Sequence, residues 1–288
     1  SGVTFVDLAE REAFLSWGEV LGRAERAAGA LAAAGVAPGD RVALVLRTGP
    51  AFLDAFFGAL HAGAVPVPLY PPVRLGRLDE YLAATARMLR ASGARLLIAS
   101  PAVRRLLGRA VEAAGDVLEL GIADPAELAE GPELWRARGP ADLALVQFSS
   151  GSTADPKAVA LTHAHLVAQV EALTALVAPG AADVLVSWLP LYHDMGLVGC
   201  LLGAMSYPGP LVLIPPEHFL ARPALWPRAI ARHRGTISAA PHFAYGYAAD
   251  RVRDADLAGL QEEERVGRGG EGEERRRRER PAERRRHG

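Results

Sequence analysis

A serine- and glycine-rich stretch, SSGSTADPK at 149–157, has the residue types best suited to holding phosphate. Its lysine, Lys157, is the only lysine among 288 residues, although lysine and arginine together number 32. Backbone N–H groups of such a turn, its hydroxyls and a mobile ammonium group can bind a polyphosphate, with roughly 1.5–3 kcal/mol from each charge-assisted hydrogen bond. The spacing alone is equally compatible with a solvent-exposed turn in which the lysine has no binding role. The stretch is not a Walker A loop, because Pro156 and Ala158 flank the lysine where glycine and a hydroxyl are required.

Two later segments carry side chains that could act on a ligand. His193, in LYHDMG, follows the apolar run DVLVSW, and PHFAY at 241–245 follows TISAA. Both runs are predicted strands, so these side chains should lie at the same edge of a sheet as the serine-rich loop. The alternatives are a histidine that satisfies buried backbone and, for Phe243, an aromatic core residue. Trp188 and Met195 are expected in the core.

The pair His163 and His165, in THAH, does not predict a metal site. An i, i+2 spacing at a helix start points the two rings in different directions, so surface or capping roles are expected. Cys200 is the one cysteine and cannot form an internal disulfide, which fits a reducing, cytoplasmic compartment. We therefore expect no protein-bound transition metal.

The elements that must position these residues alternate between helix and strand. Ser16 and Glu19 have the spacing of a capping box and open an alanine-rich helix that ends near Gly35. RVALVL at 41–46 is a predicted strand, the same rhythm recurs along the chain, and the apolar run at 141–148 leads into the serine-rich loop. This alternation predicts an α/β fold with a largely parallel sheet.

Three residues are expected to begin helices as N-caps. Ser100 precedes a proline, Thr162 follows the short predicted strand KAVAL, and Asp194 precedes MGLVGCLLGAM. Residues 195–216 carry no charge, but SYPGP interrupts them, so we expect a short buried helix, a turn and a buried strand instead of a membrane span.

Composition separates the chain into a globular body and a charged tail. Half of all residues are hydrophobic and the formal net charge is −1, which gives no general reason to expect nucleic acid or anionic membrane as a partner. The start of the chain has no recognisable signal peptide. We expect α/β subdomains at 1–140 and 141–260, and a disordered tail at 261–288 with 8 Glu and 10 Arg. Two alternatives for the tail are a frameshift product and an arginine-rich arm that binds nucleic acid. The glutamates interspersed among the arginines argue against the nucleic-acid-binding arm.

Three ordered segments resemble motifs of the adenylate-forming superfamily. LVQFSSGSTADPKAVALT at 145–162 resembles the phosphate-loop signature, and SWLPLYHDMGLVG at 187–199 resembles the next motif. The segment at 219–252, which includes PHFAY, is similar to the one that follows in fatty-acyl-AMP ligases and the related long-chain acyl-CoA synthetases. The similarity covers roughly 10–260, and three motifs in order are more specific than any one.

This resemblance implies an enzyme that uses ATP and Mg²⁺ to convert a fatty acid to an acyl-adenylate, and then passes the acyl group to the thiol of CoA or of an acyl-carrier protein. His193 would be catalytic, near the α-phosphate and the acyl carboxylate. The pyrophosphate would lie along Ser149, Ser150, Gly151, Ser152, Thr153 and Lys157, and the acyl pocket would be lined by His242, Phe243 and Tyr245. The family has glycine where this chain has Ala154 and Ala158, so the loop either differs in conformation or is strained.

Several elements of the family have no counterpart after Leu260. These are an adenine-binding segment, a ribose-binding aspartate, a hinge and a C-terminal domain with a catalytic lysine. We therefore expect the N-terminal portion of a ligase that is inactive by itself. The alternative is a non-catalytic module that binds acyl groups or a carrier protein.

Overall fold

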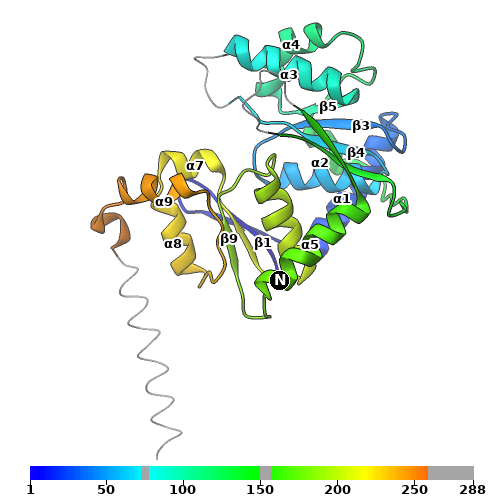
Figure 1. Ribbon diagram of the computed structural model, residues 1–288. Helices are drawn as coiled ribbons and strands as arrows, with labels where there is room; N and C mark the ends of the chain where they lie inside the picture. Colours follow the sequence, from blue (N-terminus) through cyan, green and yellow to red (C-terminus); the bar gives the residue numbers. More distant parts are fainter. Residues whose placement is uncertain (73–77, 150–156, 259–288) are drawn as a thin grey trace, which may run out of the picture.

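The computed structural model describes residues 1–72, 78–149 and 157–258 (Figure 1). The strands are β1 (Gly2–Val6), β2 (Glu12–Ser16), β3 (Arg41–Val45), β4 (Val65–Pro68), β5 (Ala94–Ala99), β6 (Ile122–Ala123), β7 (Leu143–Phe148), β8 (Ala158–Thr162), β9 (Leu185–Ser187) and β10 (Leu211–Leu213). The α-helices are α1 (Trp17–Ala33), α2 (Pro50–His61), α3 (Leu78–Ser92), α4 (Pro101–Ala114), α5 (His163–Val177), α6 (Gly203–Ser206), α7 (Pro216–Ala221), α8 (Leu225–Arg232) and α9 (His242–Ala249). Short 3-10 helices η2 (Pro125–Glu130) and η4 (Asp254–Leu257) and the π-helix η3 (Met195–Leu202) complete the described elements.

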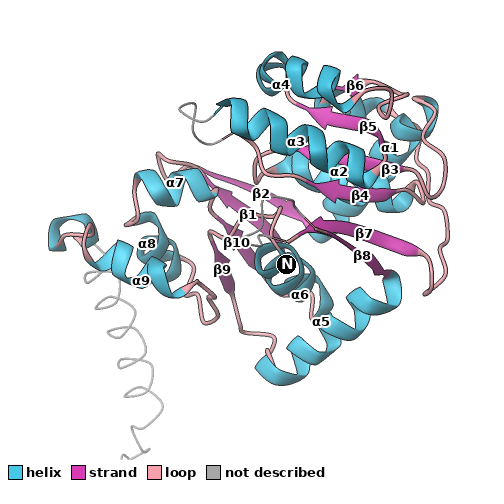
Figure 2. Ribbon diagram, turned by 45° about the horizontal axis from the view of Figure 1, so that its top comes forward, coloured by secondary structure: helices cyan, strands magenta, loops and turns pink. Residues whose placement is uncertain are grey.

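The described strands form two four-stranded sheets and a hairpin (Figure 2). One sheet has the order β2-β1-β10-β9 and is parallel except for the β1–β2 pair, and the other, β4-β3-β5-β6, is parallel throughout. Strands β7 and β8 pair antiparallel. The prediction of an α/β fold with largely parallel sheets is confirmed.

The first sheet joins strands that lie far apart in the sequence. Val3 pairs with Leu211, which in turn pairs with Leu185. A sheet therefore crosses the predicted boundary at residue 140, and the division into subdomains at that point stays a prediction. The predicted tail, 261–288, lies outside the described residues.

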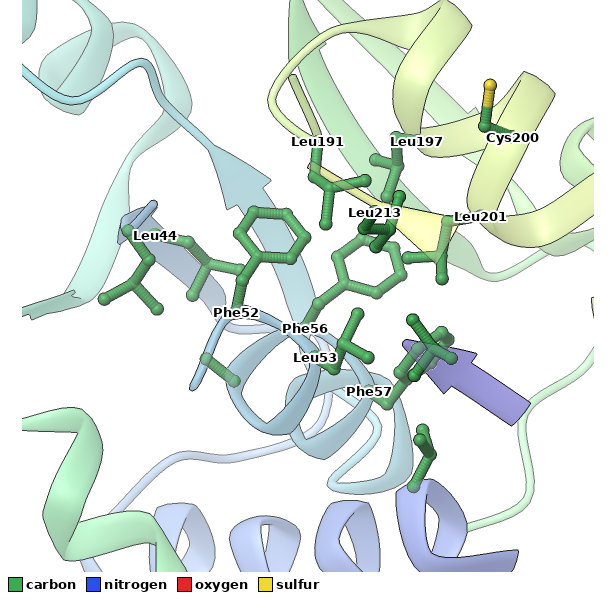
Figure 3. Packing of buried hydrophobic residues seen from close by; sticks show 14 of the residues in the cluster. Leu44, Phe52, Leu53, Phe56, Phe57, Leu191, Leu197, Cys200, Leu201 and Leu213 are labelled. Atoms are coloured by element: carbon green, nitrogen blue, oxygen red, sulfur yellow. The ribbon is translucent and has the colours of Figure 1, made fainter. Parts of the chain in front are cut away.

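Helix α2 lies at the centre of the larger hydrophobic core. Its Phe52 and Phe56 stack with ring centroids 5.9 Å apart, and both are almost fully buried. Figure 3 shows these rings between Leu44 of β3 on one side and Leu197 of η3 on the other. Each fully buried side chain of this kind contributes roughly 1.5–3 kcal/mol, so α2 ties the β3 sheet to the elements that carry the later motifs.

The predicted helix starts are confirmed, with one difference. Ser16 and Glu19 form a reciprocal capping box, and Thr162 and His165 form another, which is the capping role expected in THAH. Ser100 stands at the N-cap of α4, but its side chain makes no capping hydrogen bond.

The predicted strand TISAA is reduced to a single bridge. Ile237 pairs with Leu185, but the next contact to this edge comes from a side chain, since Ser238 Oγ donates to the Val186 carbonyl at 2.7 Å. The Ser238 hydroxyl occupies the Val186 carbonyl, which would otherwise accept from the next backbone N–H of a parallel strand. The predicted strand TISAA was therefore wrong beyond Ile237.

The uncharged stretch at 195–216 folds as predicted, into a short helix, a turn and strand β10. Among the residues that the structure describes, no helix is long and apolar enough to cross a membrane. Met195, expected in the core, is 42% exposed instead, and it lies at the start of η3 beside the exposed His193 and Asp194.

Candidate functional site

The serine-rich loop begins and ends at the open end of the β7–β8 hairpin. Phe148 pairs with Ala158, and beyond this pair the Ser149 N–H donates to the Lys157 carbonyl at 3.0 Å. The Lys157 side chain is exposed, so its ammonium group is free to reach a ligand. Ala158 lies in an extended strand, where alanine needs no positive φ.

Four of the predicted phosphate-binding residues lie outside the described part of the chain: Ser150, Gly151, Ser152 and Thr153. Of that predicted set, the structure brings Ser149 and Lys157 together. The roles predicted for all six residues stay predictions.

A buried amide joins this hairpin to the second motif. Gln147, in β7, is 7% exposed, and its Nε2 donates to the Tyr192 carbonyl at 3.3 Å. Tyr192 directly precedes His193. Burial, followed by the nearby charge of Glu217, raises the pKa of the Tyr192 phenol, which therefore stays neutral at physiological pH.

His193 presents its imidazole to solvent instead of satisfying buried backbone, so that alternative was wrong. Its side chain is 45% exposed, and Nδ1 lies 2.5 Å from the Asp194 carboxylate. A carboxylate at Nδ1 favours the tautomer with the proton on that nitrogen and leaves Nε2 as an acceptor. Asp194 also accepts from the Met195 N–H, as predicted for the residue that caps η3.

The third motif lies beside the second through an aromatic contact. The Trp188 and Phe243 rings meet edge to face, with centroids 6.2 Å apart. Trp188 is 4% exposed, as predicted, whereas Phe243 is 58% exposed and is therefore not a core residue. Tyr245 contacts the Trp226 ring and is 55% exposed, and His242 begins α9, also exposed.

Two adjoining pockets lie between α5 and η3. The first, here the larger pocket, has a volume of about 780 Å³ and a mainly apolar wall that includes the polar side chains of Gln147, His165 and Asp194. The second, the apolar pocket, has a volume of about 170 Å³. Its lining consists of Leu173, Thr174, Val177, Pro179, Leu185, Met195, Gly199, Cys200, Gly203, Tyr207, Ile237 and Ala239. The pockets share Leu173, Met195 and Gly199, so together they run from the polar side chains beside β7 to an apolar end.

Sequence reasoning missed both helices as pocket walls. It assigned the acyl pocket to His242, Phe243 and Tyr245, which are absent from the linings of these two pockets, and that assignment stays a prediction. A usable signal was present in α5, where apolar residues extend beyond one face. Val167, Leu176 and Val177 are at least half exposed, which is unusual for a helix that only covers a core.

The described residues do not form a metal cage. Within the described ranges, no group of three or more histidine, cysteine, aspartate or glutamate side chains could hold a metal ion. Mg²⁺ in phosphate-transfer sites is bound largely by substrate phosphates and water with one or two carboxylates, so such a cage is not required.

The comparisons with known proteins agree with this arrangement. The model of the family described as AMP-binding enzyme matches residues 3–264. A putative acyl-CoA synthetase of Caulobacter vibrioides is 37% identical over 228 residues, which are 79% of this chain and 40% of that protein. The long-chain-fatty-acid AMP ligase FadD26 of Mycobacterium marinum is 36% identical over 260 residues, covering 85% of this chain and 43% of its own length.

Solved structures show the same fold. A structure from a study of fatty acyl-adenylate ligases of E. coli and L. pneumophila superposes with a TM-score of 0.82 at 33% identity, over 90% of this chain and 47% of that chain. The L. pneumophila ligase in complex with acyl adenylate and pyrophosphate gives 0.77 at 28% identity, over 90% of this chain and 44% of that chain. The present chain thus spans less than half the length of these relatives. It belongs to the AMP-binding enzyme family, the adenylate-forming superfamily that its three motifs resemble.

Proposed function

We propose that this chain carries the acid-activating part of a fatty-acyl-AMP ligase. In that reaction a fatty acid and ATP give acyl-AMP and pyrophosphate, and the acyl group then passes to a thiol of CoA or of an acyl-carrier protein. The observation that carries the proposal is the pair of adjoining pockets, which have polar side chains in the wall beside β7 and an almost wholly apolar far end. A long carboxylic acid has the same division between a charged head and an apolar chain.

This reaction requires different properties at the two ends of the adjoining pockets. A carboxylate oxygen attacks the α-phosphorus of ATP, the bond from that phosphorus to the bridging oxygen breaks, and pyrophosphate leaves with the electron pair. No proton transfer is needed, so the protein contributes position and charge. Lys157 would neutralise the departing pyrophosphate, and the exposed His193, whose neighbour Asp194 lines the larger pocket, would act where carboxylate and α-phosphate meet.

Gln147 would hold the two motifs in register for this step, since its amide joins β7 to the residue before His193. Mg²⁺ would accompany the ATP phosphates and supply further charge neutralisation there. We also propose a cytoplasmic location, supported by a single, buried and unpaired cysteine.

Calorimetric titration separates this function from its main alternative. The ligands are dodecanoate, ATP and a non-hydrolysable dodecanoyl-adenylate analogue. The proposal expects all three to bind, with the analogue tightest because it occupies both halves of the site. Dodecanoate binding without any affinity for ATP or for the nucleotide half of the analogue would favour a non-catalytic acyl-binding module. No affinity for dodecanoate or the analogue would refute both.

We further propose that these 288 residues alone do not accumulate acyl-adenylate, because the matched region makes up less than half of the ligases they resemble. Hydroxamate-trapped ATP/pyrophosphate exchange with fatty acids measures this directly. Exchange well above background from the isolated chain would show that the described elements suffice for catalysis.

A further inference from the structure

The two halves of the proposed reaction differ in their need for a proton acceptor. Formation of the acyl-adenylate moves no proton, because a carboxylate attacks phosphorus and pyrophosphate leaves. Transfer to a thiol does move one, since the thiolate is the nucleophile and an ordinary thiol, with a pKa of about 8.5, is mostly protonated at neutral pH. A positioned base contributes roughly 10²–10⁴-fold to such a step. The second half therefore calls for a side chain with a free lone pair at the site.

Two histidines at the larger pocket are held as opposite tautomers. His165 lies in the wall, and its Nδ1 accepts from the Thr162 N–H at 3.2 Å, so the neutral ring carries its proton on Nε2. His193 directly precedes Asp194, another wall residue, and its Nδ1 lies 2.5 Å from the Asp194 carboxylate. Because a carboxylate only accepts, Nδ1 of His193 carries the proton and Nε2 keeps its lone pair. Of the two rings, His193 is the proton acceptor.

Backbone hydrogen bonds on both sides fix the position of His193. Its N–H donates to the Pro190 carbonyl at 3.2 Å, and its carbonyl accepts from the Leu197 N–H at 2.9 Å. The Asp194 carboxylate also accepts from the Met195 N–H at 2.7 Å, so the group that holds Nδ1 is itself held at the start of η3. A histidine base oriented by a carboxylate at Nδ1 is the arrangement that activates nucleophiles in hydrolases with a catalytic triad.

We propose that His193 is the general base for the acceptor thiol and that Asp194 is the residue that positions it. His193 Nε2 takes the thiol proton as the sulfur attacks the acyl carbonyl carbon of the acyl-adenylate. The bond from that carbon to the adenylate oxygen breaks, AMP leaves with the electron pair, and a thioester results. Asp194 stabilises the imidazolium that forms. This inference rests on the proposed function, because it needs the acyl-adenylate beside His193.

The first arm of the test requires no reaction. Long-range ¹H–¹⁵N correlation spectra of the chain at pH 8 distinguish the two neutral tautomers of each ring, and His193→Gln and His165→Gln assign the signals. We expect the proton on Nδ1 of His193 and on Nε2 of His165. Asp194→Ala should shift His193 toward the tautomer protonated at Nε2. A His193 ring that is already protonated at Nε2 in the unaltered chain would overturn the proposal.

The second arm measures thioester formation from synthetic dodecanoyl-adenylate at pH 7 with two thiols, N-acetylcysteamine and the more acidic 2,2,2-trifluoroethanethiol. With N-acetylcysteamine, His193→Gln should lower the rate by about 100-fold. Asp194→Asn should lower it by about tenfold, the difference between a charge-assisted and a neutral hydrogen bond to the imidazolium. Both losses should shrink severalfold with trifluoroethanethiol, because more of that thiol ionises without a base. Equal losses with both thiols would indicate a structural role and overturn the proposal.

His233 provides the matched control. It follows α8, lies outside the linings of both pockets, and also pairs with a carboxylate, since its Nε2 lies 3.1 Å from Glu12. His233→Gln should form thioester as fast as the unaltered chain with either thiol. All rates are compared at protein concentrations that saturate the adenylate, so that a change in affinity does not count as a change in rate.

Calorimetry with the non-hydrolysable dodecanoyl-adenylate analogue separates failure of this inference from failure of the proposed function. If the unaltered chain binds the analogue but forms thioester no faster than buffer does, or no faster than His193→Gln, the base is refuted and the proposed function stands. If the unaltered chain does not bind the analogue, the proposed function fails and the base fails with it.

Discussion

Replacing Gly196 by alanine should destabilise the turn that positions His193. A Cβ at residue 196 would lie 2.2 Å from the Pro190 carbonyl oxygen and 3.0 Å from that of Leu189. Both atoms belong to the backbone, so no side chain can rotate away to make room. Because ordinary contacts with a Cβ begin near 3.4 Å, the start of η3 and the 189–190 segment must separate by about 1.2 Å.

The cost follows from three contributions. Overpacking of this kind costs roughly 1–3 kcal/mol. The same Pro190 oxygen accepts from the His193 N–H at 3.2 Å, and weakening that hydrogen bond costs about 1 kcal/mol more. Alanine gains roughly 0.5–1 kcal/mol over glycine within a helix, which offsets part of the cost. We expect a net loss of about 2 kcal/mol, or roughly 4–8 °C in Tm for a chain of this size.

Gly199 in the same helix is the matched control, since a Cβ there has ordinary space. Gly199→Ala should leave Tm unchanged or raise it slightly. Thermal melts followed by circular dichroism, with urea titration for the free energy of unfolding, measure both variants against the unaltered chain. If Gly196→Ala melts as high as Gly199→Ala, the close approach of η3 to Pro190 does not exist in solution, and our placement of His193 loses its support.

Three further perturbations test other contacts. Lys157→Ala should weaken ATP binding about tenfold, the effect of one charge-assisted hydrogen bond, and should leave Tm unchanged because the side chain is exposed. Equal ATP affinity of the variant and the unaltered chain in calorimetry would contradict a phosphate-binding role for Lys157. Gln147→Leu leaves the Tyr192 carbonyl without its donor and should cost roughly 1–3 kcal/mol in urea unfolding, and an unchanged midpoint would contradict this. Burial opposes ionisation of Glu10, but the contacts with Arg228 and Arg222 outweigh burial and lower the pKa of the Glu10 carboxyl below 4.5. The stability that this carboxylate contributes is therefore present at neutral pH and is lost as the pH falls through its folded-state pKa. Glu10→Gln should therefore lower Tm at pH 7, and the Tm difference should shrink as the pH falls further below 4.5, whereas a Tm difference that is constant with pH would exclude this linkage.

The sequence by itself determined the features that depend on neighbours along the chain. The capping box at Ser16 and the caps at Thr162 and Asp194 were predictable because each joins residues no more than three positions apart. The alternation of helix and strand predicted the α/β class, and three ordered motifs indicated the family. These signals need no knowledge of which strands pair.

Only the tertiary structure decided how distant segments meet. Sequence periodicity does not specify the pairing of Val3 with Leu211, because many apolar strands could fill the same place in a sheet. Exposure was misjudged for Met195 and left open for Phe243, since an apolar residue faces either core or ligand depending on what packs against it. The apolar pocket arises where α5, η3 and the edge of β9 come together, a set of long-range contacts that no local pattern encodes.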